Sequence, residues 1–138
     1  MKINVELIDN LKKLCHNSSH PNVWMASALV HRNKVISYGL NSMKSNPFQK
    51  RYGKNEFAIY KHAEVDAIQN ALKMKFEKFD GSMLYVARIK YENTEKKNFI
   101  SGLAMPCSGC LRCIKEYGIK AVIYTINDEN FNVLNFNK

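Results

Sequence analysis

The chain has 138 residues, of which 46% are hydrophobic and 24% are charged. This length fits one domain, residues 1–138, that can bury a core of its own, and the composition excludes an intrinsically disordered chain. The formal net charge of +9 favours an anionic partner, for which nucleic acid, a nucleotide phosphate and an acidic membrane surface are the three candidates.

Hydrophobic periodicity predicts a chain that mixes helices with strands. Ile3, Leu7 and Leu11 recur at helical spacing, which predicts an amphipathic first helix. Residues 90–104 have weak periodicity and mixed charge, and we expect a hairpin-like excursion or a flexible loop there. In chain order, the predicted elements are helix 3–15, strands 23–31 and 35–40, helix 61–76, strand 83–89, helix 107–117, strand 119–126 and a fifth strand, 131–136. Helices layered on a mixed sheet are the consistent interpretation.

Four cysteines are present, and three of them, Cys107, Cys110 and Cys113, lie close together in the sequence. Such clustering is unsuited to a disulfide framework and typical of metal binding in a reducing compartment. Glu6 and Asp9 interrupt what would have to be the apolar region of a signal peptide. No apolar run approaches the roughly 20 residues that a membrane-spanning helix needs. We therefore expect a soluble, cytoplasmic protein with no membrane partner.

A loop of about twenty residues, from Asn41 to Tyr60, precedes the helix predicted at residue 61, and loops of that length are usually functional or disordered. It alternates basic with aromatic side chains, which suits phosphate contact together with base stacking. The alternative is a solvated surface loop in which a few aromatics pack against the protein. Nucleic acid binding through residues 44–61 therefore stays open. The basic residues are Lys44, Lys50, Arg51 and Lys54, and the interleaved aromatics are Phe48, Tyr52 and Phe57.

Two short motifs supply the residues for chemistry, His62-Ala63-Glu64 and Pro106-Cys107-Ser108-Gly109-Cys110. Each opens a predicted helix. Thiols at positions i and i+3 can reach one point beyond a helix N-terminus, where the helix dipole helps to hold thiolates. His62 and Glu64 point about 200° apart on an ideal helix, so they can converge only on a point near the helix axis, just beyond its end. Two helix N-termini that face each other across one ion satisfy both constraints.

The ligand set predicts a catalytic zinc ion. Three ligands, His62, Cys107 and Cys110, leave the fourth tetrahedral position for water, which distinguishes catalytic from structural zinc sites. Glu64 is then the predicted base that takes a proton from this water and returns protons to the substrate. Cys113 as a fourth ligand would make the site purely structural. It lies about 240° around the helix from Cys107, so we predict that Cys113 is a small buried core residue instead.

With these motifs the chain resembles the cytidine deaminase-like superfamily, which includes cytidine, deoxycytidylate, guanine and tRNA adenosine deaminases. Residues 28–41 resemble the hairpin before the zinc helix, which ends in Gly-x-Asn, and the likeness spans residues 23–126. The resemblance implies a three-layer αβα sandwich around a five-stranded mixed sheet, Zn²⁺ as cofactor, and a homo-oligomer. It also implies that Asn41 contacts the substrate sugar, that Ala63 lines the base pocket, and that backbone N–H groups near Ala63 and Cys107 hold the base.

Departures from the family's branches bear on the substrate. The tRNA-editing branch usually has a Glu immediately before its Pro-Cys, where this chain has Ala104-Met105, and its strand runs almost directly into that motif, whereas residues 90–104 intervene here. The deoxycytidylate branch often carries extra metal-binding residues before its His-x-Glu helix, and none is evident in this sequence. The polar turn at residues 127–130 suits a final antiparallel hairpin, as in the cytidine deaminase branch.

From the motifs and this resemblance we predict a zinc-dependent hydrolytic deaminase, with cytosine favoured over adenine. The first hypothesis is a free cytidine or deoxycytidine nucleoside or nucleotide as substrate, with a uracil product and ammonia. Deamination of cytosine or adenine within single-stranded DNA or RNA, including tRNA, is the competing enzymatic hypothesis. A nucleic-acid-binding zinc protein without turnover is the third, and an intact Glu64 argues against it.

Overall fold

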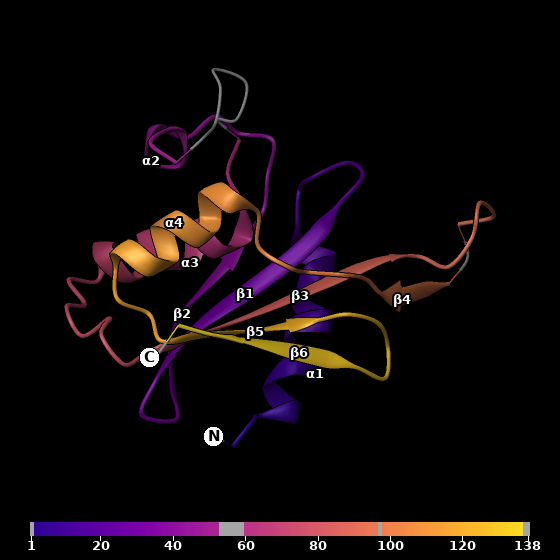
Figure 1. Ribbon diagram of the computed structural model, residues 1–138. Helices are drawn as coiled ribbons and strands as arrows, with labels where there is room; N and C mark the ends of the chain where they lie inside the picture. The colour runs from indigo at the N-terminus through magenta and orange to yellow at the C-terminus, as the bar shows by residue number, and fades with distance from the viewer. Residues whose placement is uncertain (1, 53–59, 97, 137–138) are drawn as a thin grey trace.

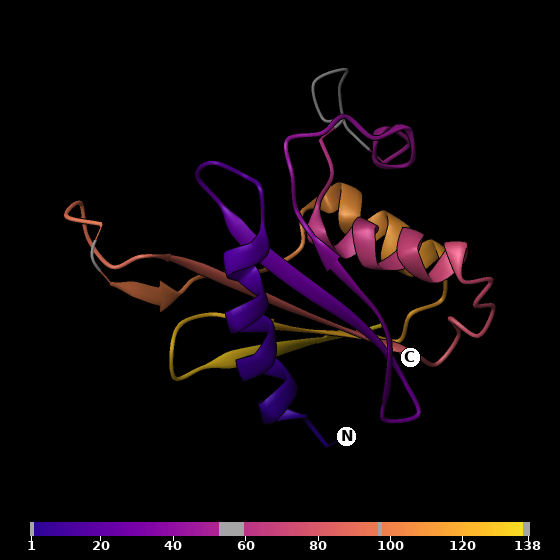
Figure 2. The same cartoon turned by 180° about the vertical axis from the view of Figure 1, so that it is seen from behind.

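The computed structural model describes residues 2–52, 60–96 and 98–136. Helices cover both faces of a central sheet, as Figures 1 and 2 show from opposite sides. Within the described residues, no helix combines the length and the apolar character needed to cross a bilayer. The elements are α1 (Val5–Leu14), the short 3-10 helix η1 (Cys15–Asn17), β1 (Trp24–His31), β2 (Lys34–Leu40), α2 (Pro47–Lys50), α3 (Ala63–Lys73), β3 (Met83–Tyr91), β4 (Phe99–Ser101), α4 (Ser108–Glu116), β5 (Ala121–Thr125) and β6 (Phe131–Asn135).

The sheet is mixed, with strand order β2-β1-β3-β5-β6 and with β4 added beside β3. β3 and β5 run parallel, and the other paired strands are antiparallel. The five strands of the main path match the predicted strands. The predicted final hairpin is confirmed, because β6 pairs antiparallel with β5 along its whole length.

The predicted count of five strands is wrong by one, because β4 forms within the excursion expected at residues 90–104. Its three residues pair with residues 89–91 of β3, beyond the stretch 83–86 that pairs with β5. Aromatic packing explains why so short a strand forms. The Phe99 ring stacks on Tyr91 with centroids 4.5 Å apart and meets the Trp24 ring edge-on at 5.7 Å. The hairpin-like alternative for this segment is therefore the correct one.

The three-layer arrangement follows from alternation along the strands. In β3, Tyr85 and Ala87 face α1 and join an apolar cluster with Leu7 and Leu11. Leu84 and Val86 face the opposite way, into a larger cluster beneath α3 and α4 that is completed by side chains such as Val65, Ile68, Cys113 and Ile114. Figure 2 shows α1 alone on its face of the sheet, with α3 and α4 on the other.

The helix that carries the first motif begins later than predicted. α3 starts at Ala63, and His62 is its N-cap, with an extended backbone (φ −95°, ψ 155°). The carbonyl oxygen of His62 already accepts the first helical hydrogen bond, from the N–H of Asp66 at 3.0 Å. Cys107 has the same role at the start of α4, with φ −71° and ψ 169°. Both motifs therefore straddle a helix boundary, which releases His62 and Cys107 from helical geometry.

The long loop between β2 and α3 contains α2, which the sequence analysis did not predict. Asn46 caps α2 by accepting a hydrogen bond from the N–H of Gln49 at 2.9 Å, and Pro47 occupies the first turn, where proline is favoured. The Phe48 and Tyr52 rings pack against each other and the core, which favours the packed-aromatic alternative for them over base stacking. Lys54 and Phe57 of the predicted nucleic-acid loop lie outside the described residues.

Candidate metal centre and catalytic site

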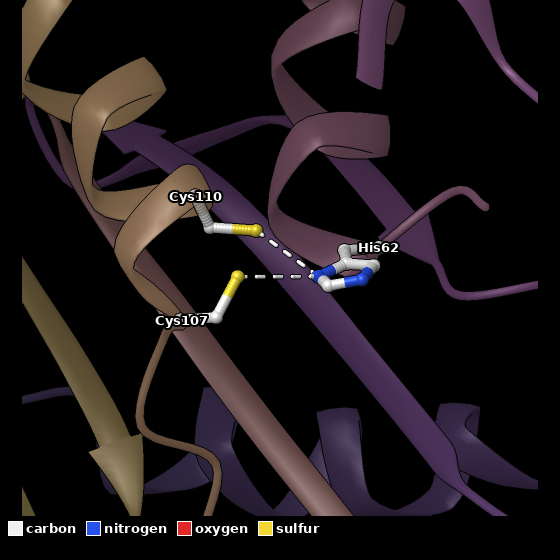
Figure 3. A group of neighbouring side chains, drawn as sticks. All are labelled: His62, Cys107 and Cys110. Carbon is white, nitrogen blue, oxygen red and sulfur yellow. Dashed lines mark hydrogen bonds between the residues drawn. The ribbon is translucent and has the colours of Figure 1, made fainter. Parts of the chain in front are cut away.

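Three predicted ligands meet at one point between α3 and α4. Figure 3 shows the imidazole of His62 facing the two sulfurs, and its Nδ1 atom lies 3.6 Å from Cys107 Sγ and 3.2 Å from Cys110 Sγ. All three ligand atoms lie within 4.8 Å of one another. A tetrahedral zinc ion with Zn–S near 2.3 Å and Zn–N near 2.0 Å would separate sulfur from nitrogen by about 3.5 Å. The spacing therefore fits one zinc ion held by three ligands from the described part of the chain.

The fold brings the ligands together because α3 and α4 start side by side at the same end of the helical layer (Figure 1). His62 and Cys107 occupy the two N-cap positions, and neither side chain makes a capping hydrogen bond. Cys110 lies in the first turn of α4. Cys113, one turn further, is fully buried in the core cluster and is not part of the ligand group, as its angular position predicted. Burial raises the pKa of the Cys113 thiol to about 12.

Glu64 is a buried carboxyl group in the first turn of α3, and only 2% of its surface is exposed. Its Oε1 atom has no hydrogen-bond partner in the described part of the chain. Burial raises the pKa of this carboxyl above its ordinary value, opposed by the neighbouring His62 charge. A buried polar atom without a partner is costly, which makes this oxygen a candidate contact for a bound group.

A cavity of about 260 Å³ lies next to the metal site, on the side of His62. Asn41 lines it, and most of the Asn41 amide is used within the protein, so its contact with a substrate sugar stays a prediction. Its Oδ1 accepts hydrogen bonds from Met25 N at 3.0 Å and Ser18 Oγ at 2.5 Å, and its Nδ2 donates to Val23 O at 2.9 Å. One N–H of Nδ2 is left for a ligand. The lining residues are His20, Val23, Met25, Asn41, Ser42, Met43, Tyr60, Lys61 and His62.

Ala63 is fully buried and lies outside the set of residues that line this cavity. Its carbonyl oxygen accepts a hydrogen bond from Ser27 Oγ at 2.6 Å, which ties the first turn of α3 to β1. Gly39 permits this close approach, because a Cβ atom there would lie 2.2 Å from the same oxygen. Contact of Ala63 with a bound base stays a prediction.

A comparison with protein families identifies the site. The model of the family described as the cytidine and deoxycytidylate deaminase zinc-binding region matches residues 1–126. The chain belongs to this family. The family is described by a zinc-binding region, and the group formed here by His62, Cys107 and Cys110 suits Zn²⁺.

Solved structures show that the fold is that of cytidine deaminases. The cytidine deaminase from Burkholderia pseudomallei superposes with a TM-score of 0.65 and 20% identity, covering 98% of this chain and 94% of that one. The apo dCMP deaminase from the cyanophage S-TIM5 gives a TM-score of 0.56 and 19% identity over 90% of this chain and 86% of that one. The same enzyme with dCMP and dUMP also gives 0.56, at 18% identity over 90% and 82%. No curated protein matches the sequence.

The ligands of this deaminase family site hold protons when no ion is bound. A hydrogen bond from Cys110 lowers the pKa of Cys107 to about 3, and the same bond together with burial raises the pKa of Cys110. The hydrogen bond with Cys107 raises the pKa of His62. Zinc binding requires deprotonated thiols and a neutral imidazole, so it displaces the protons that these groups hold.

Sequence reasoning missed two side chains at the site, Gln49 and His20. Gln49 is 3% exposed and touches both ligand helices. His20 lines the cavity, and its Nδ1 accepts the N–H groups of Asn22 at 3.1 Å and Val23 at 3.0 Å. With Nδ1 used as an acceptor, Nε2 is the ring nitrogen left to carry a proton. The Asn46-Pro47 pair, a helix-start pattern, was the only sequence feature that could have located α2 and hence Gln49.

Proposed function

We propose that this protein is a zinc-dependent hydrolytic deaminase that acts on cytosine in a free cytidine or deoxycytidine nucleoside or nucleotide. The observation that carries the proposal is the position of Glu64. Its carboxyl is buried and has an unpartnered oxygen. It follows, by two residues, the histidine whose ring faces the two thiols of α4. A carboxyl so placed adjoins the metal site without being one of its ligands.

The chemistry requires water, a proton carrier and a place for the ring. A bound zinc ion with an open fourth position lowers the pKa of water towards about 7. Glu64 accepts one proton from the attacking water and passes it to the ring nitrogen N3, then accepts the proton of the new C4 hydroxyl and passes it to the leaving exocyclic amine. Carbon C4 gains the oxygen and loses the amine, so that cytosine and water give uracil and ammonia.

The cavity supports a small substrate. Its volume of about 260 Å³ lies below the range of about 300–1,000 Å³ of sites for drug-sized ligands. Among the described residues, one N–H of Asn41 Nδ2 and the His20 Nε2–H have no acceptor, and both are available to oxygen atoms of a sugar. Lys61 also lines the cavity, but its ammonium group lies 3.0 Å from Asp66 Oδ1, and this carboxylate neutralises it. A phosphate is therefore not required for binding, and both nucleosides and nucleotides remain within the proposal.

Ammonia release from a panel of substrates tests the proposal. The zinc-loaded protein should deaminate at least one of cytidine, deoxycytidine, CMP and dCMP. Adenosine, single-stranded DNA oligonucleotides, RNA and tRNA should give little or no product. Turnover on polymers without turnover on any free cytosine compound would overturn the proposal, and so would turnover confined to adenine compounds.

A His20→Ala variant tests the proposed cavity. Loss of one hydrogen bond of about 0.5–1.5 kcal/mol should raise KM about two- to tenfold for the preferred substrate and leave kcat nearly unchanged. His16→Ala is the matched control, since His16 packs against Phe99 and is not part of the cavity lining. Equal KM values for His20→Ala and the wild type would place the substrate elsewhere.

A further inference from the structure

Gln49 contacts two of the three metal ligands. It is the third residue of α2 and is 3% exposed. Its Oε1 atom accepts a hydrogen bond from the backbone N–H of His62 at 3.1 Å. Its Nε2 atom donates to Cys110 Sγ at 4.0 Å, the outer limit for a sulfur acceptor. One primary amide therefore spans the two helices between which the ion is held.

Both contacts meet a need that the ligands create. The ring of His62 is turned to the sulfurs, and the backbone N–H of His62, at the N-cap of α3, has no acceptor within the helix. Gln49 supplies an acceptor for that backbone N–H. Cys110 is fully buried, and a buried thiolate requires hydrogen-bond donors or positive charge around it. The Nε2–H group of Gln49 supplies one donor.

The segment that carries Gln49 is itself fixed to both ligand helices. Asn46 donates from Nδ2 to Gln69 Oε1 of α3 at 2.9 Å. The guanidinium of Arg112, on α4, donates to the carbonyl oxygen of Tyr52. Gly109 allows this carbonyl to approach α4 closely, because a Cβ atom at position 109 would lie 2.3 Å from the carbonyl oxygen. The chain segment that follows α2 thus lies directly against the Cys-x-x-Cys turn, and Gln49, three residues before Tyr52, has little freedom to move away from the ligands.

We propose that Gln49 is a positioning residue of the metal centre. It holds the His62 backbone and the Cys110 sulfur in one rigid frame, and so sets the affinity for zinc and the shape of the coordination sphere. Groups that orient metal ligands in this way typically change metal affinity or activity by about 10- to 100-fold when they are removed. The inference concerns the zinc site and does not depend on which base is deaminated.

The test is metal binding by Gln49→Met, which keeps the length of the side chain and removes both hydrogen-bonding groups. Zn²⁺ affinity is measured by competition with a chromophoric chelator, and Co²⁺ is added separately to record its d–d and thiolate charge-transfer absorption. We expect Zn²⁺ binding about 10- to 100-fold weaker than in the wild type, with shifted Co²⁺ bands. Gln69→Met is the matched control, because it removes the amide that anchors Asn46 without touching a ligand.

Gln49→Asn keeps a buried amide on a side chain that is too short to span both ligands. It replaces Gln49→Met as the test variant if circular dichroism shows that Gln49→Met does not fold. Its Zn²⁺ affinity should fall as well, and by more than in Gln69→Met. Wild-type affinity, within twofold, together with an unchanged Co²⁺ spectrum in the folded variant would overturn the proposal. Neither measurement requires turnover, so failure of this proposal and failure of the proposed deamination are separately visible.

Discussion

The helices of this protein begin in two different ways. α1 and α2 are capped by asparagines, whose Oδ1 atoms accept hydrogen bonds from Leu7 N at 3.0 Å and Gln49 N at 2.9 Å. α3 and α4 are preceded by His62 and Cys107, whose side chains make no capping hydrogen bond. A good N-cap is worth about 0.5–2 kcal/mol. The two helices that build the metal site therefore forgo a stabilisation that the other two have, and their cap positions hold ligands instead.

Replacing a metal ligand at a cap position by an ordinary capping residue should have the largest effect on zinc content and turnover. His62→Asn removes a metal ligand, so zinc content should fall from one ion per chain to near zero and deaminase turnover should be lost. The free energy of unfolding of the metal-free variant should exceed that of the metal-free wild type by about 0.5–1 kcal/mol, because asparagine can cap α3. Zinc analysis and denaturant unfolding in the presence of a chelator measure the two effects. His62→Ala, which loses the ligand without supplying a cap, should lose zinc and gain no stability.

Within the first turn of α3, holding the ion and moving protons should be separable. Glu64→Gln keeps the shape of the side chain and removes its ability to accept and donate a proton, so kcat should fall about 10²- to 10⁴-fold. Zinc content should stay at one per chain, since Glu64 is not in the ligand group. Turnover is measured by ammonia release and metal by elemental analysis. Full activity in this variant would contradict the assigned role of the carboxyl.

An ordinary cap should matter only to stability. Asn4→Ala removes the hydrogen bond to Leu7 N and should lower the free energy of unfolding by about 1 kcal/mol. Zinc affinity should not change, because α1 lies on the opposite face of the sheet from the metal site (Figure 2). Denaturant unfolding and chelator competition give the two values. A marked loss of zinc affinity would show that the two faces are coupled.

The smallest expected effect is at Cys113, which belongs to the core beneath α4. Cys113→Ala should leave zinc content at one per chain and the Co²⁺ spectrum unchanged. Stability should fall modestly, because a small void replaces the sulfur. Loss of zinc in a folded Cys113→Ala protein would mean that the site is closed by a third thiolate and is structural.

The ligand set could be predicted from the sequence because both motifs are local. The spacing of Cys107 and Cys110 brings two sulfurs to one point, and the angular position of Cys113 excludes it from that point. The start of α3 could not be placed correctly, since histidine is not a favoured cap residue and apolar periodicity alone extends the helix to residue 61. The geometry that frees the His62 ring from its helix therefore appears only in the structure.

The supporting side chains were beyond sequence reasoning for a different reason. Gln49 lies 13 positions from His62 and 61 positions from Cys110, and nothing in its own neighbourhood indicates either contact. His20 lies in a polar loop, and it becomes a cavity-lining residue only because that loop folds beside Asn41 and His62. β4 was missed because the pairing that stabilises it depends on the Tyr91 and Trp24 rings, which lie outside β4.

The separation of the two ligand motifs along the chain also has a consequence for local unfolding. His62 and Cys107 lie 45 positions apart, and the segment between them contains the described strands β3 and β4. An ion bound at both ends closes this segment into a loop, so that α3, β3 and α4 can no longer open independently while the ion stays bound. The added stability grows with the ratio of free zinc to its dissociation constant. Zinc occupancy should therefore slow amide hydrogen exchange in these three elements together, and the α1 amides, outside the closed loop, should respond least.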